Sequence, residues 1–204
     1  MGFYSDVILP KLCHLSMRNR RLTPYRKRVV ASAEGRVLEV GIGSGLNLPF
    51  YPAAVREILG LEPSPQLVSM AKEAAAASPS PVTFIEGSAE SIPLDSESID
   101  TVVTTWTLCT IPQAATALDE MRRVLKPSGR LLFVEHGLAP DESVRKWQDR
   151  LTPAWRCVSG GCHLNRPIRG MIEHARFRLD RIETDYMPGP KLMTFMYEGS
   201  ARPA

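Results

Sequence analysis

The stretch VLEVGIGSGLNLPFYP, Val37 to Pro52, decides the fold of this chain. Its first residues are mostly apolar, and three glycines follow at alternate positions, Gly41, Gly43 and Gly45. Glycine tolerates positive φ and, having no side chain, allows another group to lie against the backbone. The stretch therefore predicts a buried strand that ends in a tight loop, with a ligand lying against that loop.

Similar strand-like runs recur along the chain and alternate with helical patterns. The helical run at 64–77 opens with Ser64, a good N-cap, and with Pro65, which suits the first helical position. Such alternation is typical of a doubly wound α/β fold, in which parallel strands are covered on both faces. Strands are predicted at 36–43, 57–63, 82–87, 98–106 and 129–136, and a second helix at 113–129.

The end of the chain follows a different pattern. Strand-like runs at 177–187 and 191–199 are separated only by Pro188, Gly189 and Pro190. This link is too short for a helical crossover, so these two strands should pair antiparallel. We expect an α/β, Rossmann-like, doubly wound sheet of seven strands, mostly parallel, with an antiparallel C-terminal strand.

Composition points to one ordinary globular domain, residues 1–204, with 44% hydrophobic and 23% charged residues. No apolar run of 18 residues and no secretory signal is apparent, so we expect a cytoplasmic protein with reduced cysteines. No metal site is expected, because Cys157, Cys162 and His163 lack partners at the short spacings of zinc sites.

Charge is distributed unevenly. Residues 1–36 carry 8 Lys/Arg and 2 Asp/Glu, residues 37–144 carry 6 and 14, and residues 145–181 carry 9 and 3. The basic segments are either solvated helical faces or two sides of one site mouth, which would favour an anionic substrate or weak peripheral contact with an anionic membrane. We expect residues 1–34 to form a basic N-terminal cap. Nucleic acid is not an expected partner, because no row of stacking aromatic residues accompanies the charge.

Two acids narrow the identity of the ligand. In the dinucleotide pattern G-x-G-x-x-G the third glycine would fall on Leu46, and Glu39 before the loop would repel a pyrophosphate. Glu39 suits a ligand ammonium group instead. Glu62 comes 21 residues after Gly41, where a carboxylate can accept hydrogen bonds from ribose hydroxyls. S-adenosylmethionine carries an ammonium, a ribose and an adenine without a pyrophosphate, so it is favoured over a nicotinamide dinucleotide.

With these motifs the chain resembles the class I methyltransferases. The resemblance implies that the acid and the glycines hold the methionine part of the cofactor, that the acid after the second strand holds the ribose, and that the loop GSAESIP, Gly87 to Pro93, holds the adenine. The implied cofactor-binding residues are Glu39, Gly41, Gly43, Gly45, Asn47, Glu62, Pro63, Ser88, Ala89, Glu90 and Thr105.

Later segments resemble one subgroup more closely. TLCTIPQAATALDEMRRVLKPSGRLLFVEH, TPAW (152–155) and GGCHLNR (160–166) are similar to the methyltransferase-like thiol methyltransferases of animals and their bacterial relatives. The similarity runs from about residue 35 to 187. The animal proteins begin with a hydrophobic anchor, in place of which we expect only the short basic segment here. The resemblance implies a small thiol as methyl acceptor.

The turn TTWTLC, Thr104 to Cys109, lacks the N/D-P-P-Y motif that amine methylation usually requires. A thiol, with a pKa of about 8.5, ionises partly at neutral pH and is an easier acceptor. His136, after the fifth strand, is the expected base or substrate orienter. Open alternatives are an O- or C-methyltransferase of a small aromatic or quinol and a non-catalytic binder of an adenosyl ligand. Substrate contacts are expected from Trp106, Cys109, Trp147, Trp155, Cys162, His163 and Arg166, although core packing explains the tryptophans and Cys109 equally well and Arg166 could instead cap a helix.

Overall fold

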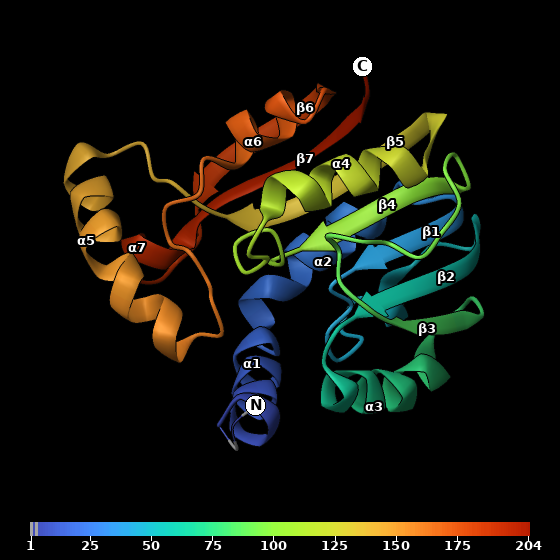
Figure 1. The fold of residues 1–204 in the computed structure, drawn as a ribbon, viewed down its shortest axis with the longest axis horizontal. Helices are drawn as coiled ribbons and strands as arrows, with labels where there is room; N and C mark the ends of the chain where they lie inside the picture. Colours follow the sequence, from blue (N-terminus) through green and yellow to red (C-terminus); the bar gives the residue numbers. More distant parts are fainter. Residues whose placement is uncertain (1, 3) are drawn as a thin grey trace.

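A computed structural model describes residues 2 and 4–204. In this part of the chain one seven-stranded sheet runs in the order β3-β2-β1-β4-β5-β7-β6 (Figure 1). The first five strands are parallel, and β7 is antiparallel to both β5 and β6. The predicted fold class and the antiparallel end of the sheet are therefore confirmed. The strands are β1 (Gly35–Val40), β2 (Val55–Glu62), β3 (Val82–Glu86), β4 (Ile99–Thr105), β5 (Leu125–His136), β6 (Phe177–Tyr186) and β7 (Phe195–Pro203).

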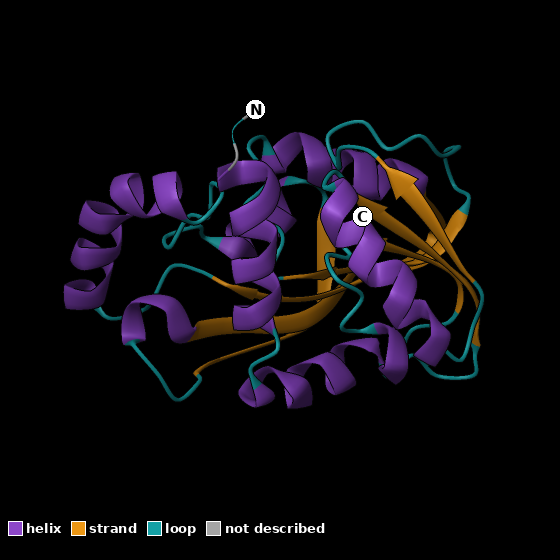
Figure 2. Ribbon diagram, turned by 90° about the horizontal axis from the view of Figure 1, so that it is seen from below, coloured by secondary structure: helices purple, strands orange, loops and turns teal. Residues whose placement is uncertain are grey.

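Helices cover both faces of the sheet (Figures 1 and 2). Neighbouring residues of one strand point to opposite faces, so Val37 packs in the layer that includes α2, while Leu38 packs in the layer that includes α4 and α6. The helices are α1 (Leu9–Met17), α2 (Thr23–Val30), α3 (Pro65–Ala74), α4 (Ala114–Val124), α5 (Glu142–Val158), α6 (Ile168–His174) and α7 (Lys191–Thr194).

The helix after the second strand begins as predicted. Ser64 is the N-cap of α3, and its hydroxyl accepts a hydrogen bond from the backbone amide of Leu67 at 3.4 Å. Pro65 occupies the first helical position. Both features satisfy or remove amide donors that a helix start leaves without intrahelical partners.

Several predicted boundaries are wrong, and β1 ends at Val40 rather than at 43. The helix expected at 113–129 ends at Val124, and β5 begins at Leu125. Pro127 explains this difference, because proline disfavours helical conformation at itself and at the preceding residue. The strand expected at 191–199 begins instead with the short helix α7, and β7 continues to Pro203.

The carboxyl ends of the five parallel strands lie at one edge of the sheet. The loops after β1, β2, β4 and β5 therefore meet there, which is where open α/β sheets bind ligands. The described residues include no helix long and apolar enough to cross a membrane.

Candidate active site

The glycine loop after β1 has three residues with positive φ, Gly41 at 68°, Gly43 at 56° and Gly45 at 75°. A side chain at Gly41 would collide with Thr107, and one at Gly45 would come within 3.0 Å of Leu48 and Ala74. At Gly43 the nearest atom to an added Cβ is a backbone oxygen at 3.9 Å. The outer glycines thus permit packing of the protein, whereas Gly43 faces open space that a ligand can fill.

Glu62 fastens this loop to the end of β2. Its Oε2 accepts from the amide of Gly43 and its Oε1 from the amide of Ser64, both at 3.0 Å. Burial raises the pKa of this carboxyl, and the two amides partly oppose that rise. Each oxygen retains a lone pair for a ribose hydroxyl.

Glu39 lies beneath the loop rather than open to a ligand. Its side chain is buried, with Oε1 2.7 Å from Asn47 Nδ2 and Oε2 2.8 Å from the hydroxyl of Tyr51. Burial raises its pKa to about 7, while these hydrogen bonds and the charge of Arg26 act in the opposite direction. The expected direct contact with a ligand ammonium is therefore not the arrangement seen here.

Asn47 connects the carboxylate of Glu39 to the buried guanidinium of Arg26. Arg26, on α2, donates to Asn47 Oδ1 at 2.8 Å, and Asn47 Nδ2 also lies 3.1 Å from Thr105 Oγ1. The guanidinium of Arg26 lies 4.9 Å from the ring centroid of Trp106. Arg26 and Tyr51 were missed at the sequence level, where Arg26 was simply one residue of a basic segment.

The expected adenine loop is joined to the start of α4. Glu90 accepts from the amide of Gln113 at 2.7 Å and lies 3.0 Å from the hydroxyl of Ser88. Ala89 is buried in the core, and Pro63, after β2, is exposed.

The turn after β4 is held from two sides. Glu135, an acid inside the buried β5, accepts at Oε1 from Thr104 Oγ1 and from the amides of Thr107 and Leu108, all within 3.1 Å. Trp106, in the same turn, has a φ of 51°, a strained value for a bulky residue. Glu135 was also missed, although an acid in an apolar strand was the available signal.

Arg166 secures the other side of that turn. Its guanidinium donates to the carbonyl oxygens of Leu108, of Ile111 at 2.6 Å and of Pro112 at 3.4 Å. Arg166 therefore holds the turn after β4, a role that was not among those expected for it, and its contact with a substrate stays a prediction. His163 lies beside it, and its amide donates to the carbonyl of Cys109 at 2.8 Å.

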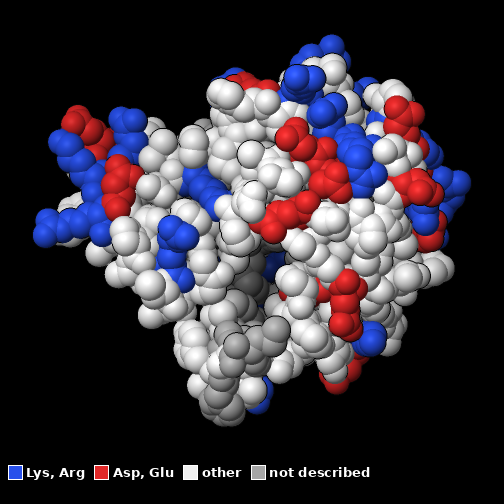
Figure 3. All heavy atoms as spheres, viewed as in Figure 1, with Lys and Arg blue, Asp and Glu red and all other residues white. Residues whose placement is uncertain are grey.

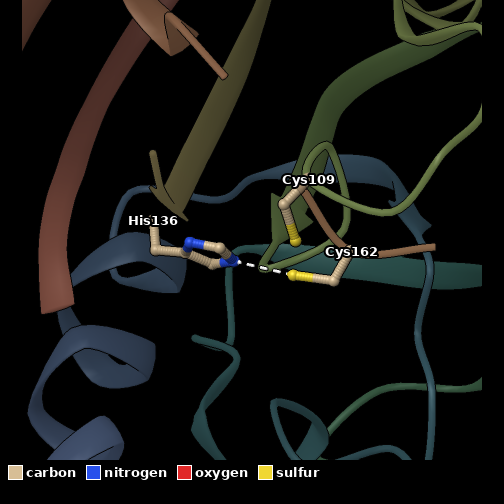
Figure 4. Close-up of side chains that lie close together, drawn as sticks. All are labelled: Cys109, His136 and Cys162. Atoms are coloured by element: carbon tan, nitrogen blue, oxygen red, sulfur yellow. Dashed lines mark hydrogen bonds between the residues drawn. The ribbon is translucent and has the colours of Figure 1, made fainter. Parts of the chain in front are cut away.

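Three side chains from separate elements converge at the ends of β4 and β5 (Figure 4). Nε2 of His136 lies 3.2 Å from Sγ of Cys162, and these atoms and Sγ of Cys109 are all within 4.8 Å of one another. His136 and Cys109 are buried, while Cys162 is partly exposed. We call these three residues the Cys-His-Cys cluster.

The pKa values of His136 and Cys162 are both shifted within the cluster. Burial lowers the pKa of His136, but Cys162 and Glu135 raise it more, so the net shift is upward. The pKa of the Cys162 thiol is raised by the neighbouring Cys109 and by burial, against an opposing effect of His136. The Cys162 thiol is therefore held as a neutral group in the arrangement described.

The N-terminal segment lies over this edge of the sheet. His14 Nδ1 is 2.7 Å from Ser44 Oγ of the glycine loop, and the hydroxyl of Tyr4 donates to the carbonyl of Val158 at 2.5 Å. Leu9 occupies the space where a side chain at Gly160 would lie. Figure 3 shows a hollow between the glycine-loop side and the α5 side of this face. Within the segment expected to form the cap, α2 instead packs on the sheet through Val29 and Val30.

Two tryptophans expected at the acceptor site lie on α5. Trp147 is 53% exposed and lines a surface cavity with Val144 and Leu192, away from the Cys-His-Cys cluster. Trp155 is half-buried, and its Nε1 is buried without a hydrogen-bond partner among the described residues.

Comparisons with known proteins bear on the family and on the fold. A family model described as a methyltransferase domain matches residues 38–133. The thiol S-methyltransferase TMT1B of Rattus norvegicus is 34% identical over 163 residues, which are 78% of this chain and 66% of the relative. This chain therefore spans slightly less than two thirds of that relative's length.

A C-methyltransferase and a solved structure are also similar to this chain. The ubiquinone/menaquinone biosynthesis C-methyltransferase UbiE of Syntrophotalea carbinolica is 34% identical over 173 residues, 81% of this chain and 68% of the relative. A solved S-adenosylmethionine-dependent methyltransferase from Aquifex aeolicus superposes with a TM-score of 0.67 at 16% identity, covering 96% of this chain and 98% of that one. The last comparison bears on the fold alone.

Proposed function

Because this chain belongs to the S-adenosylmethionine-dependent methyltransferases, we propose that it transfers the methyl group to the sulfur of a small thiol. In this proposal the cofactor lies against Gly43, where the loop has open space. Glu62 takes the ribose, and Glu39 acts through Asn47 and the loop rather than by direct contact.

The observation that carries the choice of a thiol is that the thiol S-methyltransferases TMT1B of rat, human and mouse and TMT1A of human are all 32–34% identical to this chain. The alignment with the rat protein covers 163 residues, more than the span 38–133 of the methyltransferase model. The likeness therefore extends beyond the cofactor half into segments that flank the acceptor side. It supports a shared acceptor class more directly than the fold does.

The turn after β4 also favours sulfur over nitrogen as acceptor. The carbonyls of Leu108 and Cys109 already accept hydrogen bonds from Arg166 and His163, and the carbonyl of Thr105 accepts from the Thr107 hydroxyl. The side chains of this turn, TTWTLC, also offer no carboxylate or amide oxygen that could accept from an amine. A thiolate needs no such acceptor, because it carries no proton to be held.

Proton loss from the thiol is the step that the protein must assist. His136 is the base we assign, since its imidazole is buried at the end of β5 beside Cys162. Much of the remaining rate can come from holding donor and acceptor in line.

The test measures release of S-adenosylhomocysteine with alkyl thiols, aromatic thiols, phenols and quinols under matched conditions. We expect turnover with thiols and little with their oxygen analogues. Faster methylation of a quinol or phenol than of every thiol would favour the second candidate, an O- or C-methyltransferase, for which the 34% identity to UbiE is the supporting observation. Cofactor binding without turnover on any acceptor would favour a non-catalytic binder.

A further inference from the structure

The Cys-His-Cys cluster has the composition and spacing of a metal site. Two thiol sulfurs and one imidazole nitrogen, from three segments separated along the chain, lie within 4.8 Å of one another. Zn²⁺ binds sulfur at about 2.3 Å and nitrogen at about 2.0–2.1 Å, so tetrahedral ligand atoms are roughly 3.3–3.8 Å apart. The 3.2 Å separation of His136 Nε2 and Cys162 Sγ is already close to such an edge. Small side-chain shifts would complete the geometry.

The number of ligands distinguishes this cluster from a structural zinc site. Structural sites use four protein ligands, whereas sites with three protein ligands keep a fourth position for water or substrate. Short spacings along the chain could not reveal this cluster, because Cys109 and His136 reach Cys162 only in the folded protein (Figure 4).

We propose that Cys109, His136 and Cys162 bind Zn²⁺ and leave one position open for the acceptor thiol, which binds there as its thiolate. The proposal rests on the proposed thiol methylation. Two deprotonated cysteines would neutralise the ion, and the partly exposed Cys162 gives it a route of entry. The cluster lies at the same edge of the sheet as the glycine loop. A thiolate bound to the metal would therefore lie at the edge where we place the cofactor.

The proposed step balances without a redox partner. The acceptor thiol releases its proton to solvent as its sulfur binds the metal. A bond then forms between that sulfur and the methyl carbon, while the bond from the methyl carbon to the sulfonium breaks. The products are a neutral thioether, which is a weaker ligand and leaves, and S-adenosylhomocysteine. Under this proposal His136 is a metal ligand rather than the base.

A disulfide between Cys109 and Cys162 is the competing outcome. It would need an oxidant, and it would give no role to the nitrogen of His136 that lies against Cys162. Zinc accounts for all three side chains, which is why we favour it.

The test uses the full-length protein, reduced and freed of metal by a chelator, then titrated with Zn²⁺ and separately with Co²⁺. We expect one ion per chain and, with Co²⁺, the intense absorption of thiolate-to-metal charge transfer. Cys109→Ser and Cys162→Ser should each weaken Zn²⁺ binding at least about 100-fold, since loss of outer partners alone costs 10–100-fold. Cys157→Ser, at an exposed free cysteine outside the cluster, is the matched control and should bind as the parent does.

The results of the titration and of turnover assays test the metal site, its role in activation and the thiol assignment separately. No Co²⁺–thiolate absorption in the folded, reduced parent, or equal binding by Cys157→Ser and Cys162→Ser, would overturn the metal site. A Cys109–Cys162 disulfide in a protein that binds no metal after reduction would replace it. Thiol turnover by chelated, metal-free protein at the full rate would overturn the metal's role in activation and leave thiol methylation standing. Metal binding with methylation only of phenols would leave the site standing and overturn the thiol assignment.

Discussion

The amide of Gly43 donates to Oε2 of Glu62 at 3.0 Å, so the loop after β1 and the end of β2 form one rigid surface. The open side of Gly43 lies on this surface. Local chain order had suggested that both residues serve one ligand, and their direct bond places them together before any ligand binds.

Gly43→Ala should abolish detectable binding of S-adenosylhomocysteine, because the new methyl group would enter the space assigned to the ligand. The fold should survive with a cost of about 1–2 kcal/mol from the positive φ. Gly45→Ala is the comparison: its methyl group would meet Leu48 and the α3 residues at about 3 Å, so it should lower the melting temperature more. Calorimetric titration and thermal unfolding measure the two effects. Unchanged affinity in Gly43→Ala would refute this placement of the cofactor.

Glu39 should make stability depend on pH. Burial raises its folded-state pKa to about 7 from an ordinary 4.5. The folded state therefore binds more protons than the unfolded state between these values, and this contribution to stability is present below pH 4.5 and lost as pH rises to 7. Relative to Glu39→Gln, the free energy of unfolding should fall by roughly 3 kcal/mol across that window. Urea unfolding of both proteins at several pH values is the measurement. If the free energy of unfolding changes with pH in the same way for the parent and for Glu39→Gln, the prediction is wrong.

Removing residues 1–17, which include α1, should leave S-adenosylhomocysteine binding within about threefold and lower turnover strongly. The hydrogen bond of this segment to the glycine loop joins His14 to Ser44, and Leu9 lies against Gly160 on the acceptor side. Tyr4→Phe, which removes one hydrogen bond to Val158, is the mild control and should retain most of the activity. Full activity of the shortened protein would refute a capping role.

The same segment carries the proposed peripheral membrane contact. Leu12 and Leu15 of α1 are 49% and 68% exposed, and Lys11 and Arg18 are close to them in the chain. We expect sedimentation with anionic vesicles to weaken as salt increases and to be lost in Leu12→Ser/Leu15→Ser. Equal sedimentation of this variant and the parent would exclude α1 as the contact.

Arg166→Met should destabilise the fold by about 2–4 kcal/mol, because it leaves buried carbonyls of the turn after β4 without their charged donor. Arg169→Met, which removes only an exposed ion pair with Glu173, is the matched control and should change stability by less than about 1 kcal/mol. Urea unfolding of both variants measures how much stability each one loses. Similar losses in the two variants would show that Arg166 does not support the turn.

The chain order of the strands, together with α3 and α4, and the glycine loop at 41–45 could be predicted from the sequence. Both depend on short-range patterns: hydrophobic periodicity, glycines that follow a strand, and an N-cap with proline at Ser64 and Pro65. Parallel strands bring their carboxyl ends to one edge, so Glu62 could be placed beside the glycine loop from chain order alone. The wrong end of α4 shows the limit of this reasoning, because the helical pattern extended past Val124 while Pro127 favoured the strand.

Contacts between side chains of different elements, in contrast, follow from the tertiary fold. Arg26 reaches Asn47, and through it Glu39, because α2 packs on the sheet. Cys109, His136 and Cys162 meet because the turn after β4, the end of β5 and the loop after α5 lie together. No local propensity encodes such contacts, since they arise from the packing of residues far apart in the chain. That is why a chain whose cysteines look isolated in sequence brings two of them together with a histidine at the edge of its sheet.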